Sequence, residues 1–178
     1  PLPSPVINCN STTNSIEFIW STILGATSYN VTVISGMNGS MPTDTSYLVT
    51  GLVPNDQVTI QVEAVGSGAC GNSTTEVTCE AQDCLPITIT IDPVADICLD
   101  ADAMPITLTA TQNGGNGTGT FTWSGDGIVD AIAGTYDPSL ANIGGNNVVV
   151  TYTEDNCDYN ESMNINVFCL LYTSDAAD

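Results

Sequence analysis

The chain has 178 residues, of which 42% are apolar and 20 are Asp or Glu, and it contains no Lys, Arg or His. The net charge of −20 excludes nucleic acids and anionic membranes as partners, because binding to either depends on basic side chains. A Ser-His-Asp or Cys-His site would have no base, and Schiff-base chemistry would have no amine. What remains is carboxylate chemistry with a hard cation such as calcium, or a protein with no cofactor.

Residues 1–84 alternate apolar and polar side chains in short segments that are separated by turn residues. Ile16, Phe18 and Trp20, for example, share one phase. Period-two alternation indicates strands with one buried and one solvated face. Short strands at this spacing predict an antiparallel β-sandwich. The expected strands are Val6–Cys9, Ser15–Ser21, Ser28–Ile34, Tyr47–Val49, Val58–Ala64 and Thr75–Cys79.

A second strand pattern follows the expected junction at Cys79–Pro86. No segment shows a convincing helical period. The sequence therefore predicts an all-β protein of two tandem antiparallel β-sandwiches, with domains at 1–84 and 85–168. The expected strands of the second domain are Ile87–Ile91, Ile106–Ala110, Thr120–Trp123, Asn147–Thr153 and Ser162–Phe168, with a hairpin at Glu154–Glu161.

Two segments are uncharged and rich in β-forming residues, namely Leu85–Ile91 and Asn147–Thr153. Each is either an internal strand or an edge that pairs with a neighbouring molecule. A chain without basic residues cannot polymerise through salt bridges. Strand pairing and end-to-end apolar packing are the routes left for self-association into a homopolymer or tandem array.

The seven cysteines indicate disulfides. No C-x-x-C pair is present, so neither a redox motif nor a zinc knuckle is indicated. Scattered cysteines in strand-rich modules are typical of an oxidising compartment, here the extracellular space or the cell surface. The chain begins PLPSP without a visible signal peptide, which suggests a processed or truncated secreted protein.

The positions of the cysteines within the two strand patterns suggest one pairing scheme. Cys9 and Cys70 occupy places in the first module that correspond to those of Cys98 and Cys157 in the second. The scheme therefore predicts Cys9–Cys70 and Cys98–Cys157, each closing a loop of about 60 residues worth roughly 3–4 kcal/mol. Cys79–Cys84 would then close a small loop at the junction. Sequence alone leaves other connectivities open.

A further set of residues in the first module matches a family pattern. These residues are Pro5, Trp20, Tyr29-Asn30-Val31, Leu52-x-Pro54 and Val58-x-Ile60-x-Val62-x-Ala64. With them, residues 1–84 resemble a fibronectin type III domain. Val58 stands where the family usually has Tyr, so the tyrosine corner is absent. The resemblance implies a sandwich fold and no particular function, because this fold hosts many roles.

The second module carries its own set of matching residues. They are Cys98, Ile106–Ala110, Trp123–Gly127, Gly134–Pro138, Gly144, Val149–Thr153 and Cys157. With them, residues 85–168 resemble the immunoglobulin-like, PKD-like modules of large secreted surface proteins of gliding, Bacteroidota-type bacteria. The resemblance implies modules in long tandem arrays that act as adhesins, stalks or fibres. The last ten residues, 169–178, resemble a translated sequencing-adapter tail, and on that interpretation Cys169 is not a native thiol.

Two kinds of surface site are predicted. Six Asn-x-Ser/Thr sequons are candidate glycan acceptors, although chance also produces sequons in a chain rich in Ser and Thr. Asp96, Asp100 and Asp102 lie close enough in sequence to converge on calcium, and the alternative is a solvated acidic loop. The sequon residues are Asn10, Asn30, Asn38, Asn72, Asn116 and Asn160.

The remaining candidates favour a protein without catalysis. The six Glu residues are mostly placed on the solvated phase of strands, so a glycosidase pair is not favoured. Trp20, Tyr29, Trp123 and Tyr136 could form a carbohydrate platform, but their alternation phase places them in the cores. We expect a structural extracellular protein, a subunit or segment of a bacterial filament or adhesin stalk. The alternative is a carbohydrate- or surface-binding module appended to a secreted enzyme.

Overall fold

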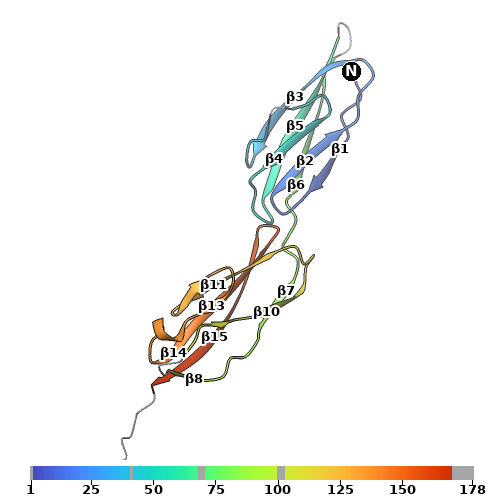
Figure 1. The fold of residues 1–178 in the computed structure, drawn as a ribbon. Helices are drawn as coiled ribbons and strands as arrows, with labels where there is room; N and C mark the ends of the chain where they lie inside the picture. The colour runs from blue at the N-terminus through green and yellow to red at the C-terminus, as the bar shows by residue number, and fades with distance from the viewer. Residues whose placement is uncertain (1, 41, 68–70, 100–102, 170–178) are drawn as a thin grey trace, which may run out of the picture. The chain divides into compact units, whose positions relative to one another are not determined.

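The computed structural model describes residues 2–40, 42–67, 71–99 and 103–169 (Figure 1). Its contacts divide the chain into two units. Unit 1 comprises Pro1–Cys84 and Asp155–Cys157, and unit 2 comprises Leu85–Glu154 and Asp158–Asp178. The assignment of Asp155–Cys157 to unit 1 was not anticipated by a linear division of the chain after residue 84.

Unit 1 is built from six strands in two three-stranded antiparallel sheets. The sheet orders are β1-β2-β4 and β3-β5-β6. The two sheets bury one common core (Figure 1), which makes the unit a β-sandwich. The strands are β1 Ile7–Ser11, β2 Ser15–Trp20, β3 Ala26–Ser35, β4 Ser46–Thr50, β5 Gln57–Gly66 and β6 Ser73–Glu80.

The alternation in the sequence explains which side chains form the core of unit 1. On β2, Ile16, Phe18 and Trp20 are buried, and the residues between them are more exposed. The central strand β5 buries every second residue from Val58 to Ala64. The two inward faces meet in a single cluster, as expected when successive side chains of a strand point to opposite faces.

Unit 2 combines a four-stranded sheet with two smaller ones. The orders are β11-β14-β15-β8, β10-β7 and β12-β13-β9. The ladder between β15 and β8 is parallel, which is a local departure from the antiparallel pattern expected. The elements are β7 Ile87–Ile91, β8 Ile97–Leu99, β9 Ile106–Thr107, β10 Ala110–Gly114, β11 Thr120–Gly125, β12 Ile128–Asp130, β13 Thr135–Tyr136, the short 3-10 helix η1 Pro138–Leu140, β14 Gly144–Glu154 and β15 Cys157–Cys169.

The core of unit 2 is centred on β14. Val148, Val150 and Tyr152 are each 2% exposed or less, and they pack with Trp123 of β11 and Tyr136 of β13. The described part of the chain is therefore all-β apart from the short η1 segment. Within that part, no helix has the length and apolarity that a membrane crossing requires.

The two uncharged β-rich segments have different positions in unit 2. β14 lies between β11 and β15 and is therefore an internal strand. β7 pairs with β10 on one side only, and no ladder is recorded on its other side among the described residues. Of the two, β7 is thus the strand whose edge is open to a further strand.

A two-residue turn joins β14 to β15. Its residues, Asp155 and Asn156, have φ angles of 50° and 62°. Two successive positive φ values are typical of a type I′ hairpin. Gly, Asn and Asp are the residues preferred at these two positions. The tight turn places Cys157 at the first position of β15.

Candidate functional site

The cysteine pairing differs from the predicted scheme. Cys9 of β1 bonds to Cys79 of β6, with a Cα–Cα distance of 5.9 Å. This bond connects the two sheets of unit 1, so the predicted Cys9–Cys70 and Cys79–Cys84 bonds are both wrong. Cys70 itself lies outside the described residues.

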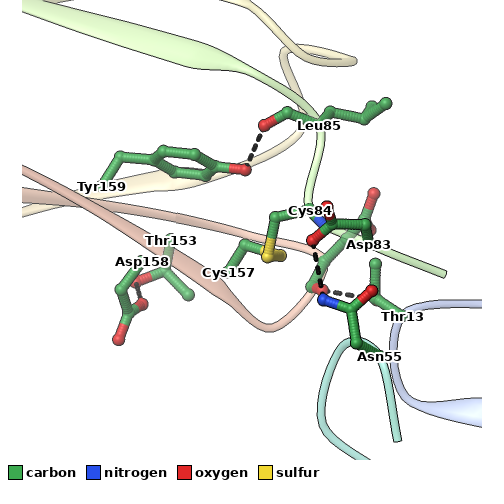
Figure 2. Close-up of a disulfide and its surroundings, with 10 residues drawn as sticks. Thr13, Asn55, Asp83, Cys84, Leu85, Thr153, Cys157, Asp158 and Tyr159 are labelled. Atoms are coloured by element: carbon green, nitrogen blue, oxygen red, sulfur yellow. Dashed lines mark hydrogen bonds between the residues drawn. A yellow bond between two sulfur atoms is a disulfide. The ribbon is translucent and has the colours of Figure 1, made fainter. Parts of the chain in front are cut away.

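The second disulfide joins Cys84 to Cys157, also with a Cα–Cα distance of 5.9 Å (Figure 2). The predicted Cys98–Cys157 bond is therefore wrong as well. Cys98 is a free, exposed thiol on β8. The bond ties Cys84, four residues after the last strand of unit 1, to the first residue of β15.

Hydrogen bonds hold the residues on either side of this disulfide (Figure 2). In unit 1, Asp83 Oδ1 accepts from Cys84 N at 2.7 Å and from Asn55 Nδ2 at 3.1 Å. Thr13 Oγ1 donates to the Asp155 carbonyl at 2.5 Å. The half-cystines therefore lie on segments that are fixed by side chains of unit 1.

A signal for the first correct pair was present in the sequence. Cys79 continues the inward phase of β6, in which Thr75 and Val77 are half-buried and Cys79 is 3% exposed. A cysteine on the inward phase of a strand faces the opposite sheet. The predicted scheme rested on corresponding cysteine positions in the two modules, and these positions do not reflect the face of the strand on which each cysteine lies.

Of the three predicted calcium residues, one lies in the described part of the chain. Asp96 is exposed, and its Oδ1 accepts from Asn166 Nδ2 at 3.0 Å. Asp100 and Asp102 lie outside the described residues. Among the residues described, no group of three His, Cys, Asp or Glu side chains could hold a metal ion. Calcium binding stays a prediction.

Two other carboxylates accept hydrogen bonds within unit 2. Asp130 Oδ1 accepts from Ile132 N and Ala133 N, both at 2.9 Å, which is typical of a turn shaped by an Asp side chain. Asp126 Oδ2 accepts from Asn142 Nδ2 at 2.9 Å, and this bond connects two segments that lie 16 residues apart. Hydrogen bonds within the protein therefore explain the positions of Asp126 and Asp130, and no bound ligand is needed to explain them.

Glu154 is a buried acidic residue that the predicted sites did not include. Its side chain is 4% exposed, and it lies at the end of β14. Oε1 accepts from Thr118 N at 2.6 Å and Thr118 Oγ1 at 2.9 Å, and Oε2 accepts from Asn116 N at 3.0 Å. These bonds, led by that from the Thr118 amide, hold the pKa of Glu154 below its ordinary value although burial raises it.

The six predicted glycan acceptors are all exposed. Two of them share a partner: Asn30 Nδ2 donates to Glu63 Oε2, and Asn72 Nδ2 donates to Glu63 Oε1, each at 2.9 Å. These two hydrogen bonds, that from Asn30 first, lower the pKa of Glu63. Exposure is necessary for glycosylation but does not demonstrate it, so glycans stay a prediction. The others are Asn10, Asn38, Asn116 and Asn160.

The four aromatic side chains that were candidates for a carbohydrate platform lie in the cores or pack against them. Trp20 is 2% exposed, Trp123 is 5% exposed and Tyr136 is fully buried. Tyr29 packs on Trp20 with ring centroids 5.8 Å apart. The prediction from the alternation phase is thus confirmed, and these side chains form no carbohydrate platform.

An open groove lies on unit 2 between β7 and the first half of β15. Its volume is about 400 Å³. Ile89, Ile91, Pro93 and Met163 line it together with the carboxylate-bearing residue Glu161. The groove contains no constellation of nucleophile, base and acid, since the lining side chains are apolar or single polar groups.

Comparison with known proteins finds similarity in structure only. No protein-family model matches the chain, and no curated protein sequence matches it. Among solved structures, the fibronectin(III)-like modules of CbhA from Clostridium thermocellum are similar, with 14% identity and a TM-score of 0.39 over 92% of this chain and 95% of that one.

Two animal ectodomains are similar at a comparable level. One is the Ig1–Ig3 ectodomain of mouse nectin-like molecule 4, with 11% identity and a TM-score of 0.32 over 94% of this chain and 65% of that one. The other comprises extracellular domains 3–5 of Drosophila OTK, with 12% identity and a TM-score of 0.32 over 94% and 62%. The fold types are those that the two modules resemble in sequence. At these scores the likenesses carry no inference about activity, ligand or partner.

Proposed function

We propose that the chain is a non-enzymatic structural segment of an extracellular surface protein, either a filament subunit or a stretch of adhesin stalk. The supporting observation is the burial of the aromatic residues Trp20, Trp123 and Tyr136 in the two cores. A sugar-binding module needs exposed rings on which a sugar can stack, whereas a spacer module needs its rings for stability. The two disulfides support an oxidising, extracellular compartment.

Self-association is the second part of the proposal. The chain has 20 acidic and no basic side chains, so contacts between copies would be apolar or would use strand edges. The β7 edge offers backbone groups to a further strand, because its recorded ladder is with β10 alone among the described residues. Screening by salt or by calcium would lower the repulsion between copies.

Negative-stain electron microscopy of the native secreted material tests this proposal. Regular filaments would support a filament subunit, and their collapse on chelation of calcium would give the acidic loops a structural role. Extended tandem arrays without lateral order would support a stalk. Compact, isolated particles under all conditions would contradict both forms of the proposal.

The groove on unit 2 favours a second candidate, a binding module appended to a secreted enzyme. Its apolar floor and its single acidic side chain, Glu161, are compatible with a carbohydrate or a neutral surface. Phe168 is the exposed aromatic ring in the described part of the chain, with 51% exposure. A glycan array that shows specific binding, lost in Met163→Asp, would establish this alternative. Absence of binding across the array would remove it.

A further inference from the structure

The two disulfides close consecutive loops that do not overlap. Cys9–Cys79 spans a sequence separation of 70, and Cys84–Cys157 spans 73. We propose that the pair forms a covalent bypass for tension. A pull on the two ends of the chain would pass through residues 1–9, the first S–S bond, residues 79–84, the second S–S bond and then β15. Residues 10–78 and 85–156 would stay out of the line of force.

The bypassed loops hold most of both cores. The first contains all of β2, β3, β4 and β5, and the second contains every strand from β7 to β14. The covalent path between the ends therefore does not pass through the fully buried core residues Phe18, Ile60 and Val150. Tension would reach them only through side-chain packing and interstrand hydrogen bonds, which rupture without lengthening the covalent path.

The junction on the path is anchored to unit 1. Ala81 is 2% exposed, and its N donates to the Asp56 carbonyl at 2.8 Å. Gln82 N donates to the Thr12 carbonyl at 2.9 Å, and Cys84 N donates to Asp83 Oδ1 at 2.7 Å. Residues 79–84 therefore form a short, fixed link between the two S–S bonds, with little slack to release.

The two end segments of the path are each held by the fold. At the N-terminal end, Leu2 N donates to the Gly71 carbonyl at 3.1 Å, and Ser73 Oγ donates to the Pro3 carbonyl at 2.7 Å. At the other end, β15 is paired with β14 and, through Val167–Cys169, with β8. Tension can peel these segments away, but the peeling stops at Cys9 and at Cys157.

The consequence is a chain that barely lengthens under load. At about 3.4 Å per residue, each bypassed loop would add roughly 240 Å of contour if it were released. With both disulfides intact it adds none, and peeling of the 13-residue strand β15 adds at most roughly 45 Å of contour. This property follows from connectivity, so it stands whether the chain serves in a filament, a stalk or an appended module.

Single-molecule force spectroscopy tests the bypass directly. Residues 1–178 would be placed between marker domains of known unfolding length and stretched before and after reduction by a phosphine. We expect no release near 240 Å from the oxidised chain and two such releases from the reduced chain. Cys9→Ser with Cys79→Ser should release one loop, as should Cys84→Ser with Cys157→Ser. Cys98→Ser is the matched control, because it removes a cysteine that is free in the described part of the chain and should release neither.

The total contour at full extension is a second readout that does not depend on whether a variant folds, because covalent connectivity fixes it. Each variant that lacks one disulfide should reach a contour roughly 240 Å longer than that of the oxidised wild type. An oxidised chain that released either loop would overturn the proposal. A failure to form filaments would leave this result unaffected, so the two tests are separable.

Cleavage after glutamate provides an independent measurement. On a non-reducing gel, a chain cut only after Glu63 or Glu154 should stay in one piece, because each position lies inside a disulfide loop. A cut after Glu80, which lies between Cys79 and Cys84, should separate two fragments without reductant. Separation after a cut at Glu63 alone would contradict the bypass.

Discussion

Glu154 and Asn146 are the buried polar side chains in the described part of the chain. No side chain of this protein carries a positive charge, so Glu154 is stabilised by hydrogen-bond donors alone. The donors are backbone and hydroxyl groups of residues 116–118 and, at 3.4 Å, the hydroxyl of Tyr152. Gly115, with φ of +65°, leaves the space that a Cβ would otherwise take from the Glu154 carboxylate. A buried anion can persist in this way when its oxygens receive several donors.

This arrangement predicts a pH dependence. The folded-state pKa of Glu154 is lowered. The ionised Glu154 side chain therefore stabilises the fold fully above the pKa of an unfolded Glu, which is about 4.3. This stabilisation is lost as the pH falls through the folded-state pKa. Glu154→Gln should lower the melting temperature at pH 7, and the mutant should lose less stability than the wild type between pH 5 and pH 2. Differential scanning calorimetry across this pH range provides the measurement.

Glu76→Gln is the control for that experiment, because Glu76 is an exposed residue on β6. It should leave the melting temperature at pH 7 close to that of the wild type. Equal losses in the two variants would show that the hydrogen bonds from residues 116–118 do not stabilise the folded protein.

Among the elements, β3 and β5 belong to one sheet, yet they bury isoleucine side chains to different extents. Ile60 on the central strand β5 is fully buried, and Ile34 on the edge strand β3 is 52% exposed. Burial of apolar area is the main favourable contribution to folding. The same amino acid therefore contributes differently according to the face of the strand that carries it.

Truncation of these two residues gives a matched comparison. Ile60→Ala should destabilise unit 1 by about 2–5 kcal/mol, because it leaves a cavity between the sheets. Ile34→Ala should change the free energy of unfolding by less than about 0.5 kcal/mol. Urea denaturation followed by tryptophan fluorescence measures both. Similar losses would contradict the register in which Ile60 faces the core.

At the scale of the whole molecule, charge and disulfides act in opposite directions. The net charge of −20 destabilises compact and associated states through self-repulsion. The two disulfides restrict the unfolded chain, and each closes a loop long enough to contribute about 4 kcal/mol on the chain-entropy model. Removal of Cys84–Cys157 by the double Ser substitution should therefore lower the free energy of unfolding by about 2–5 kcal/mol.

Chemical denaturation of the oxidised protein measures that loss, and Cys98→Ser is again the control. The free thiol of Cys98 closes no loop, so its removal should leave the midpoint unchanged. A loss in Cys98→Ser as large as in the double variant would contradict the assigned pairing.

Salt should promote self-association of this molecule. The screening length falls from about 30 Å at 0.01 M salt to about 8 Å at 0.15 M, and with it the repulsion between acidic copies. Light scattering should thus report larger particles as sodium chloride is added. A fall in scattering with added salt would contradict this prediction. It would require attraction between opposite charges, and a chain without basic residues cannot provide that attraction between its own copies.

The residue pattern alone was enough to predict the all-β fold and much of the core. Strict alternation at Ile16, Phe18 and Trp20, and at Val58, Ile60 and Val62, assigned the buried faces, because the side-chain period of a strand is local to that strand. The chain contains no His, Lys or Arg, so any role that depends on a basic side chain of this chain itself is not expected.

Only the tertiary structure decided the pairings between distant segments. Cys9 bonds to Cys79, and Cys84 bonds to Cys157, because strand order and the tight turn at Asp155-Asn156 bring those residues together. The burial of Glu154 and the open edge of β7 also depend on the tertiary structure. Contacts of this kind depend on which strands become neighbours. A local pattern of alternating side chains shows that Cys79 faces the core, but it does not show which residue of the opposite sheet lies across from it.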